Sequence, residues 1–234
     1  MRMRFPILLS LLYVCYGAYA QDVNVKILDS LLLDSNYERV IELTSGERKL
    51  DSVDGIDLQC KRAQALIRVG NLSAAKTLIA ELEKAVERQT TKKDLALAMV
   101  LAAKGTVSLN EGRNDLALES LQASIEAYER SGNSNTLGAA DAIATLGIIY
   151  NVTGKTQQAE EQLLRALSLR KEQLPGKHEL MAATYNDLGL VYTNIDPDKA
   201  LSYYDQALEV YQALHEATHP KIAIANTNLG VIYR

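Results

Sequence analysis

Residues 146–166 read LGIIYNVTGKTQQAEEQLLRA, and this stretch decides the fold because its pattern returns along the chain. Its glycine, Gly147, has counterparts at intervals of 42 residues, with one interval of 41 at the end. The five positions are Ala63, Gly105, Gly147, Gly189 and Gly230, and the later markers keep step at Gly70, Gly112 and Gly154 and then at Ala75, Ala117, Ala159 and Ala200. A fixed period of this length is typical of a protein built by stacking one supersecondary unit.

Within each repeat the spacing predicts two helices. Large apolar residues follow the i, i+3, i+4 pattern, and small residues stand where two helix axes must approach closely. Glycine at the position of Gly154 ends the first helix, because its left-handed backbone carries no Cβ penalty. Four residues at or near the start of the second helices are predicted N-caps: Asn71, Asn114, Thr156 and Asp196. We therefore expect an all-α fold, a right-handed superhelical solenoid of antiparallel helix pairs.

The order Leu146-Gly147-x-x-Tyr150, Gly154, Ala159, Leu163, Ala166 resembles the tetratricopeptide repeat motif. The resemblance covers residues 51–234, the last repeat being incomplete, and a degenerate helical hairpin is expected at 21–50. Repeats of 42 residues resemble those of kinesin light chains and of exported bacterial proteins with many repeats. HEAT and armadillo repeats have a comparable period and are the alternative. The resemblance implies a scaffold for protein–protein interaction.

The first twenty residues have the pattern of a secretory signal. Arg2 and Arg4 precede an uncharged, mostly apolar run, and residues 18–20 read AYA, a small-x-small cleavage pattern. The run is shorter than the roughly 20 residues that a membrane-spanning helix needs, so we expect no membrane span after cleavage. The residues before Cys15 are too large for a lipoprotein signal. We expect cleavage after Ala20 and export to the periplasm or the extracellular space.

Composition excludes several classes of protein. With 23% charged and 47% hydrophobic residues, the chain is neither disordered nor collagen-like. The net charge is −4, and it becomes −6 once the two arginines of the signal are removed, so we expect no nucleic-acid partner. Cleavage leaves Cys60 as a lone cysteine, which we interpret as a small buried side chain.

The sequence predicts no active site, cofactor or metal. It contains no phosphate-binding glycine loop, nucleophile elbow or zinc-protease motif. His178 and His219 each stand eleven residues before their repeat glycine, which predicts that both begin a helix. His215 and His219 are four apart, but Pro220 begins a new helix and separates them. We therefore expect a chain that is not an enzyme.

The positive signal is the row of polar residues along the first helices, which line the concave wall of such a solenoid. Amides and hydroxyls recur there beside small residues, and an amide offers both a donor and an acceptor to a peptide backbone. The alternative is that these side chains are merely solvated. The predicted groove residues for a peptide or partner protein are Gln64, Arg68, Thr106, Asn110, Asn151, Asn186, Asp187, Thr193, Asn194, Thr227 and Asn228.

The sequence stops after residues 229–233, LGVIY, in the middle of a predicted first helix. Because each repeat covers the apolar face of its neighbour, we expect either a longer protein or self-association through this uncapped end. In a longer protein the repeats are the recognition arm of an effector domain. The resemblance offers a CHAT-type protease, a histidine kinase or a helix-turn-helix regulator.

Overall fold

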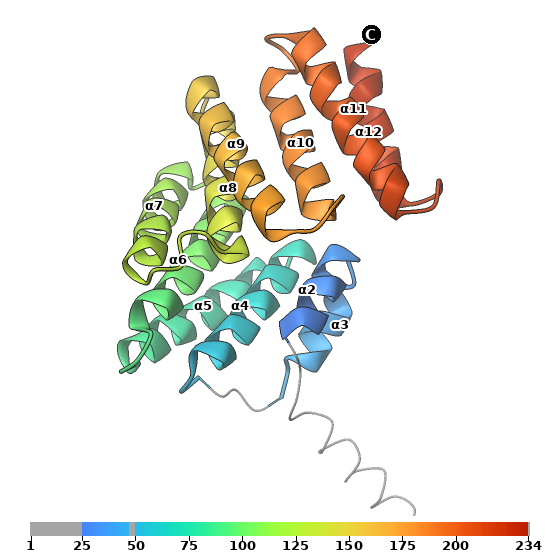
Figure 1. The fold of residues 1–234 in the computed structure, drawn as a ribbon. Coiled ribbons are helices and arrows are strands. Elements are labelled where there is room, and N and C mark those ends of the chain that lie inside the picture. The colour runs from blue at the N-terminus through green and yellow to red at the C-terminus, as the bar shows by residue number, and fades with distance from the viewer. Residues whose placement is uncertain (1–24, 47–49, 234) are drawn as a thin grey trace, which may run out of the picture. The chain divides into compact units, whose positions relative to one another are not determined.

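The computed structural model describes residues 25–46 and 50–233. The predicted signal peptide and its cleavage site lie outside the described residues, as does Arg234. The chain divides into two compact units, Met1–Ala96 and Leu97–Arg234, and the boundary falls within one helix, α6. In the described part of the chain every regular element is a helix (Figure 1).

The first unit contains a short hairpin followed by a longer one. Leu28, Val40 and Ala65 are fully buried together and join the two hairpins. A polar contact adds to this junction, because the Arg62 guanidinium donates to the Thr44 carbonyl at 2.9 Å. Cys60 is buried as predicted, and burial raises the pKa of its thiol. The helices are α2 (Val25–Leu33), α3 (Tyr37–Leu43), α4 (Val53–Arg68) and α5 (Leu72–Glu87).

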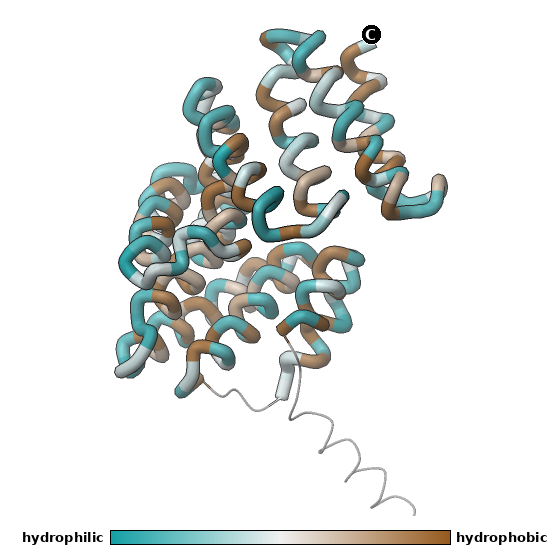
Figure 2. Tube along the Cα trace, viewed as in Figure 1, coloured by the Kyte–Doolittle hydropathy of each residue, from teal (hydrophilic) through white to brown (hydrophobic). Residues whose placement is uncertain are grey.

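The second unit continues the pattern of paired helices. Within it α8 packs on α9 and α10 on α11, and neighbouring pairs meet through α7 with α8, α9 with α10, and α11 with α12. The helices are α6 (Lys93–Asn110), α7 (Asn114–Arg130), α8 (Leu137–Val152), α9 (Thr156–Gln173), α10 (Glu179–Tyr192), α11 (Pro197–Leu214) and α12 (Pro220–Ile232). Brown and teal segments alternate along these helices in Figure 2, as expected for helices buried on one side.

The turns between paired helices confirm some of the predictions made from the sequence and contradict others. Gly154 has a φ of +75°, which confirms the predicted left-handed residue after the first helix. Asn71 and Asp196 are N-caps as predicted, each accepting a backbone N–H three residues on, at 3.2 and 3.0 Å. The prediction is wrong for Asn114 and Thr156. These two are the first residues inside α7 and α9, whose N-caps, Arg113 and Lys155, make no capping bond through their side chains.

The repeat glycine is required by close packing within a helix pair. A Cβ on Gly147 would lie 2.8 Å from Cγ of Leu163, a fully buried residue of α9. A Cβ on Gly189 would meet the ring of Tyr204 in α11 in the same way. The glycine therefore marks the side of each first helix that faces its own partner, which leaves another side available to solvent.

Candidate interaction surface

Side chains on α8, on α10 with the turn that follows it, and on α12 repeat with a spacing of four and three residues. In α8 the set begins at Asp141 and ends at Val152, and in α12 it begins at Ile224. Residues spaced in this way share one face of a helix. α8 contacts α10, and α10 is bonded to α12, so the three sets lie on neighbouring helices. We call them together the first-helix face: Asp141, Thr145, Ile148, Val152, Ala183, Asp187, Leu190, Asn194, Ile224, Asn228 and Val231.

Four large apolar side chains on this face are exposed. Val152 is 60% exposed, Leu190 46%, Ile224 56% and Val231 54%. On α10 and α12 these residues are flanked along the face by the polar residues Asp187, Asn194 and Asn228, whereas on α8 Val152 follows the apolar Ile148. An exposed apolar residue on its own is ordinary, but four on one face of three neighbouring helices make a surface suited to a partner.

The structure brings some of the predicted groove residues together. The side-chain amide N–H of Asn228 in α12 donates to the side-chain oxygen Oδ1 of Asn186 in α10 at 2.6 Å, a bond between equivalent helices of successive repeats. Asp187 is half-buried. Burial raises the pKa of Tyr211 to about 12, and the negative charges of Glu179 and then Asp187 contribute to the same shift. Thr227 is exposed beside Asn228, and its hydroxyl donates to the Ala223 carbonyl at 2.8 Å.

Other predicted residues are placed differently. Thr193 lies 2.8 Å from the Tyr204 hydroxyl of α11, so it contacts the partner helix of its own pair. Asn151 is half-buried near the end of α8, and Asn194 is exposed in the turn after α10. In α6 the Asn110 amide donates to the carbonyl of Thr106 at 2.8 Å, within one helix.

The remaining two predicted residues belong to the other unit. Gln64 and Arg68 are both exposed on α4, in the first unit. The predicted set therefore does not form one contiguous cluster within either unit. The larger group lies in the second unit, on α6, α8, α10 and α12.

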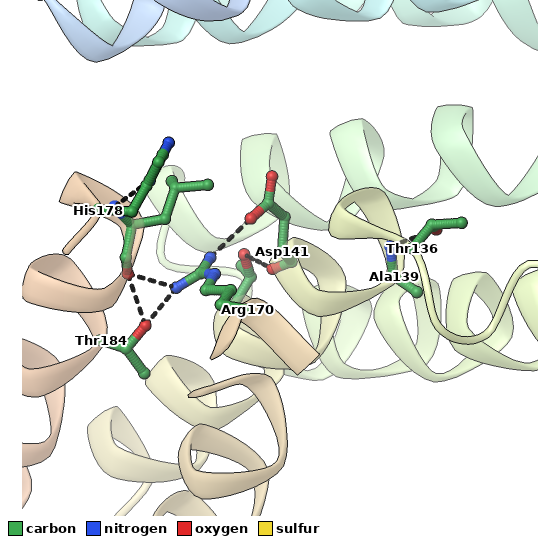
Figure 3. Close-up of polar contacts among 8 residues, drawn as sticks. Thr136, Ala139, Asp141, Arg170, His178 and Thr184 are labelled. Carbon is green, nitrogen blue, oxygen red and sulfur yellow. Dashed lines mark hydrogen bonds and ion pairs between the residues drawn. The ribbon is translucent and has the colours of Figure 1, made fainter. Parts of the chain in front are cut away.

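A buried arginine anchors one end of the first-helix face and was missed from the sequence. Arg170 of α9 is 5% exposed, and its guanidinium donates to Asp141 Oδ1 at 2.6 Å and to the Leu180 carbonyl at 3.0 Å (Figure 3). It also donates to the Thr184 hydroxyl. These bonds join α8, α9 and α10. The sequence did distinguish this arginine, because the equivalent positions in the other repeats hold the uncharged residues Val86, Tyr128 and Tyr211.

A second polar junction joins the same repeats. Lys199 of α11 donates to Glu160 of α9 at 2.5 Å and to the hydroxyl of Tyr192, in α10, at 2.7 Å. Its ammonium lies 3.9 Å from the centre of that ring. Hydrogen bonds from Lys199 and Tyr192 lower the pKa of Glu160, while partial burial opposes them. Two charged side chains, Arg170 and Lys199, thus cross-link successive helix pairs.

Within the described ranges, no group of three or more His, Cys, Asp or Glu side chains is placed to hold a metal ion. In the same part of the chain, no helix is long and apolar enough to cross a membrane.

Comparison with known protein families matches residues 94–172 and 180–234 to the tetratricopeptide repeat. The chain therefore belongs to the tetratricopeptide repeat family, and the predicted all-α fold of helix pairs is confirmed. This match decides against HEAT and armadillo repeats. The family is generally non-catalytic and generally serves protein interaction.

Solved structures agree with this assignment. The structure of BtubC (BKLC) from P. vanneervenii matches with a TM-score of 0.68 and 20% identity, over 91% of this chain and 84% of that chain. A putative kinesin light chain from Podosopora anserina, with nearly identical TPR-like repeats, matches with a TM-score of 0.57 and 17% identity, over 78% of this chain and 87% of that one. At these identities the likeness concerns the fold alone. No curated protein matches the chain.

Proposed function

We propose that this chain is a non-catalytic scaffold that binds a peptide or partner protein on the first-helix face of its second unit. The observation that carries the proposal is that Val152, Leu190 and Val231 are exposed on one face of three neighbouring helices, where Leu190 and Val231 hold the same repeat position. Fully burying such a side chain is worth about 1.5–3 kcal/mol. A partner that covers all three therefore gains substantial binding free energy.

The polar members of the face favour a polypeptide over a purely apolar ligand. Asn194 and Asn228 stand in the same rows as Leu190 and Val231 and carry side-chain amides. Amides donate to and accept from a peptide backbone, while the apolar positions contact its side chains. This division matches an extended or helical segment lying across successive first helices.

Three further proposals rest on the sequence. The chain acts after export and cleavage at Ala20, as the leader pattern indicates. Its repeats are of the 42-residue kind, and the scaffold acts alone or as the recognition arm of a larger enzyme or signalling protein. Self-association is a separate proposal, and mass measured across a range of concentrations tests it.

Peptides selected from a random library on the immobilised full chain test the binding proposal. We expect Leu190→Lys to weaken the selected peptides by about tenfold or more, because a charge replaces apolar contact worth over 1.4 kcal/mol. Leu164→Lys is the matched control: Leu164 is 42% exposed, but it lies on α9. Its effect is expected to stay within about twofold. Equal affinity for all three proteins, or a library that yields no binder, would count against the proposal.

A further inference from the structure

Two helices of the second unit begin with a histidine cap. His178 is the N-cap of α10 and His219 the N-cap of α12, as predicted from their place in the repeat. In each, the ring Nδ1 accepts the backbone N–H of the residue two positions on, Leu180 at 3.2 Å and Lys221 at 3.3 Å. A nitrogen that accepts a hydrogen bond carries no proton, so both caps require the neutral ring with its proton on Nε2.

A proton on either ring removes its cap. The imidazolium ion has two donors and no acceptor, so the bond to the helix N–H is lost. The positive charge then stands at the N-terminus of a helix, where the helix dipole is also positive. Both effects destabilise the first turn. As a residue type, histidine gains its charge between about pH 5 and pH 8.

Titratable and charged groups surround the second cap. The His219 ring stacks on His215, the C-cap of α11, with 3.8 Å between ring centroids and 9° between planes. His215 Nε2 lies 3.2 Å from Glu179 Oε1 of α10, and Lys221 of α12 bonds to the same carboxylate oxygen. Glu179 is buried, and the ring of Tyr211 in α11 lies beside His215. The carboxylate of Glu179 thus links α10 to the end of α11 and the start of α12.

The first cap has its own electrostatic setting. Burial lowers the pKa of His178, the neighbouring carboxylate of Glu179 opposes this, and the Arg170 guanidinium of α9 lowers it further. A histidine whose pKa is lowered on folding adds stability that is present above its ordinary value of 6.5. That stability is lost as the pH falls through the lowered pKa. Acid therefore weakens the start of α10.

We propose that the starts of α10 and α12 form an acid-sensitive joint, in which protonation of His178 and His219 removes both caps and loosens the attachment of α12 to α10. The joint consists of residues of the second unit alone, so it does not depend on whether the first-helix face binds a partner. It is a conformational response of this fold to a proton.

Amide hydrogen exchange in the full chain, purified without a histidine tag, tests the joint. The probes are the amides of Lys221, Ile222 and Ala223, of which the last two bond to the His219 carbonyl at 3.0 and 3.3 Å. We expect protection, corrected for intrinsic rates, to fall roughly fivefold more than in the rest of α12 between about pH 7.5 and pH 5, the effect of losing one cap. His219→Asn keeps a capping oxygen that does not titrate, so this extra fall should disappear. An equal fall in wild type and in His219→Asn, or none in wild type, would overturn the proposal.

Two further measurements check that the caps, and not another group, cause the pH dependence. In wild type, the ring ¹⁵N shifts of His178 and His219 at neutral pH should show an unprotonated Nδ1, and a protonated Nδ1 there would overturn the proposal even if the variants failed to fold. His215→Gln removes the stacked ring but leaves both caps. If the pH dependence vanished in that variant, the stack rather than the cap would be responsible, and the assignment to His219 would be wrong.

Discussion

The first helices of the two units carry the same register of outward residues but differ in chemistry at the later positions of that register. In α4 of the first unit the positions are Asp57, Lys61, Gln64 and Arg68, so all four are polar. The Lys61 ammonium lies 2.5 Å from Asp29 and 3.8 Å from Asp57. In α8 of the second unit, the last two of the equivalent positions are Ile148 and Val152. One repeat framework therefore presents either a surface whose charges pair with each other or a surface that offers apolar contact.

This difference shows at which positions the repeat does not constrain the type of residue. The glycine position and the positions facing the paired helix are constrained by packing, as Gly147 against Leu163 shows. The outward positions are not, so they can be apolar in one unit and charged in the other. The residues at the outward positions, rather than the repeat motif, therefore indicate the function of such a chain.

The largest effect is expected from breaking the polar junction below the first-helix face. Arg170→Ala leaves Asp141 without its cation and the Leu180 carbonyl without this donor. Removing one partner of a buried ion pair costs about 3–5 kcal/mol, and the half-exposure of Asp141 places the expected loss near the lower end. Urea unfolding measures it. The control Arg113→Ala removes an exposed pair with Glu111 and should change the unfolding free energy by less than about 1 kcal/mol.

A smaller loss is expected at the packing position. Gly147→Ala places a methyl against Leu163 and costs about 1–2 kcal/mol, after the gain in helix propensity is subtracted. Gly230 holds the equivalent position in α12, where no described atom lies within 4 Å of an added Cβ. Gly230→Ala should therefore stabilise the protein, by up to about 1 kcal/mol. If both variants were equally stable, close packing would not explain the repeat glycine.

The smallest effect is expected in the charged row of the first unit. Burial, followed by the repulsion of Asp29 and Asp54, raises the pKa of Asp57, while Lys61 opposes the shift. A carboxyl group whose pKa is raised on folding stabilises the protein in acid, and this stability is lost as the pH rises through the raised pKa. Asp57→Asn should therefore raise Tm at neutral pH by a few degrees, and the gain should shrink as the pH falls towards 4. A Tm gain that is the same at both pH values would contradict this account of the row.

The sequence predicted the parts of the molecule that repeat. The period, the left-handed glycines and the starts of α10 and α12 at His178 and His219 follow from local chemistry that recurs at fixed spacing. The capping role of Asn114 and Thr156 was wrong, because one residue of offset moves a side chain from the cap into the helix.

The candidate surface was harder to predict than the fold. Thr193 and Leu190 are three apart on the same repeat, yet Thr193 contacts Tyr204 while Leu190 is exposed. Which of them faces solvent depends on how the two helices of one pair pack on each other, and the period alone does not contain that angle. Arg170 was missed for a related reason, since its three acceptors come from residues distant in sequence.

The most direct test of the central claim is site-specific photo-crosslinking of a library-selected peptide. A photoreactive residue is placed at Leu190 of the second unit or at Gln64 of the first, which hold the same repeat position. The account predicts an efficient crosslink from Leu190 and little from Gln64, because only the first of these rows offers exposed apolar contact. Equal crosslinking from both positions, or crosslinking from Gln64 alone, would contradict it.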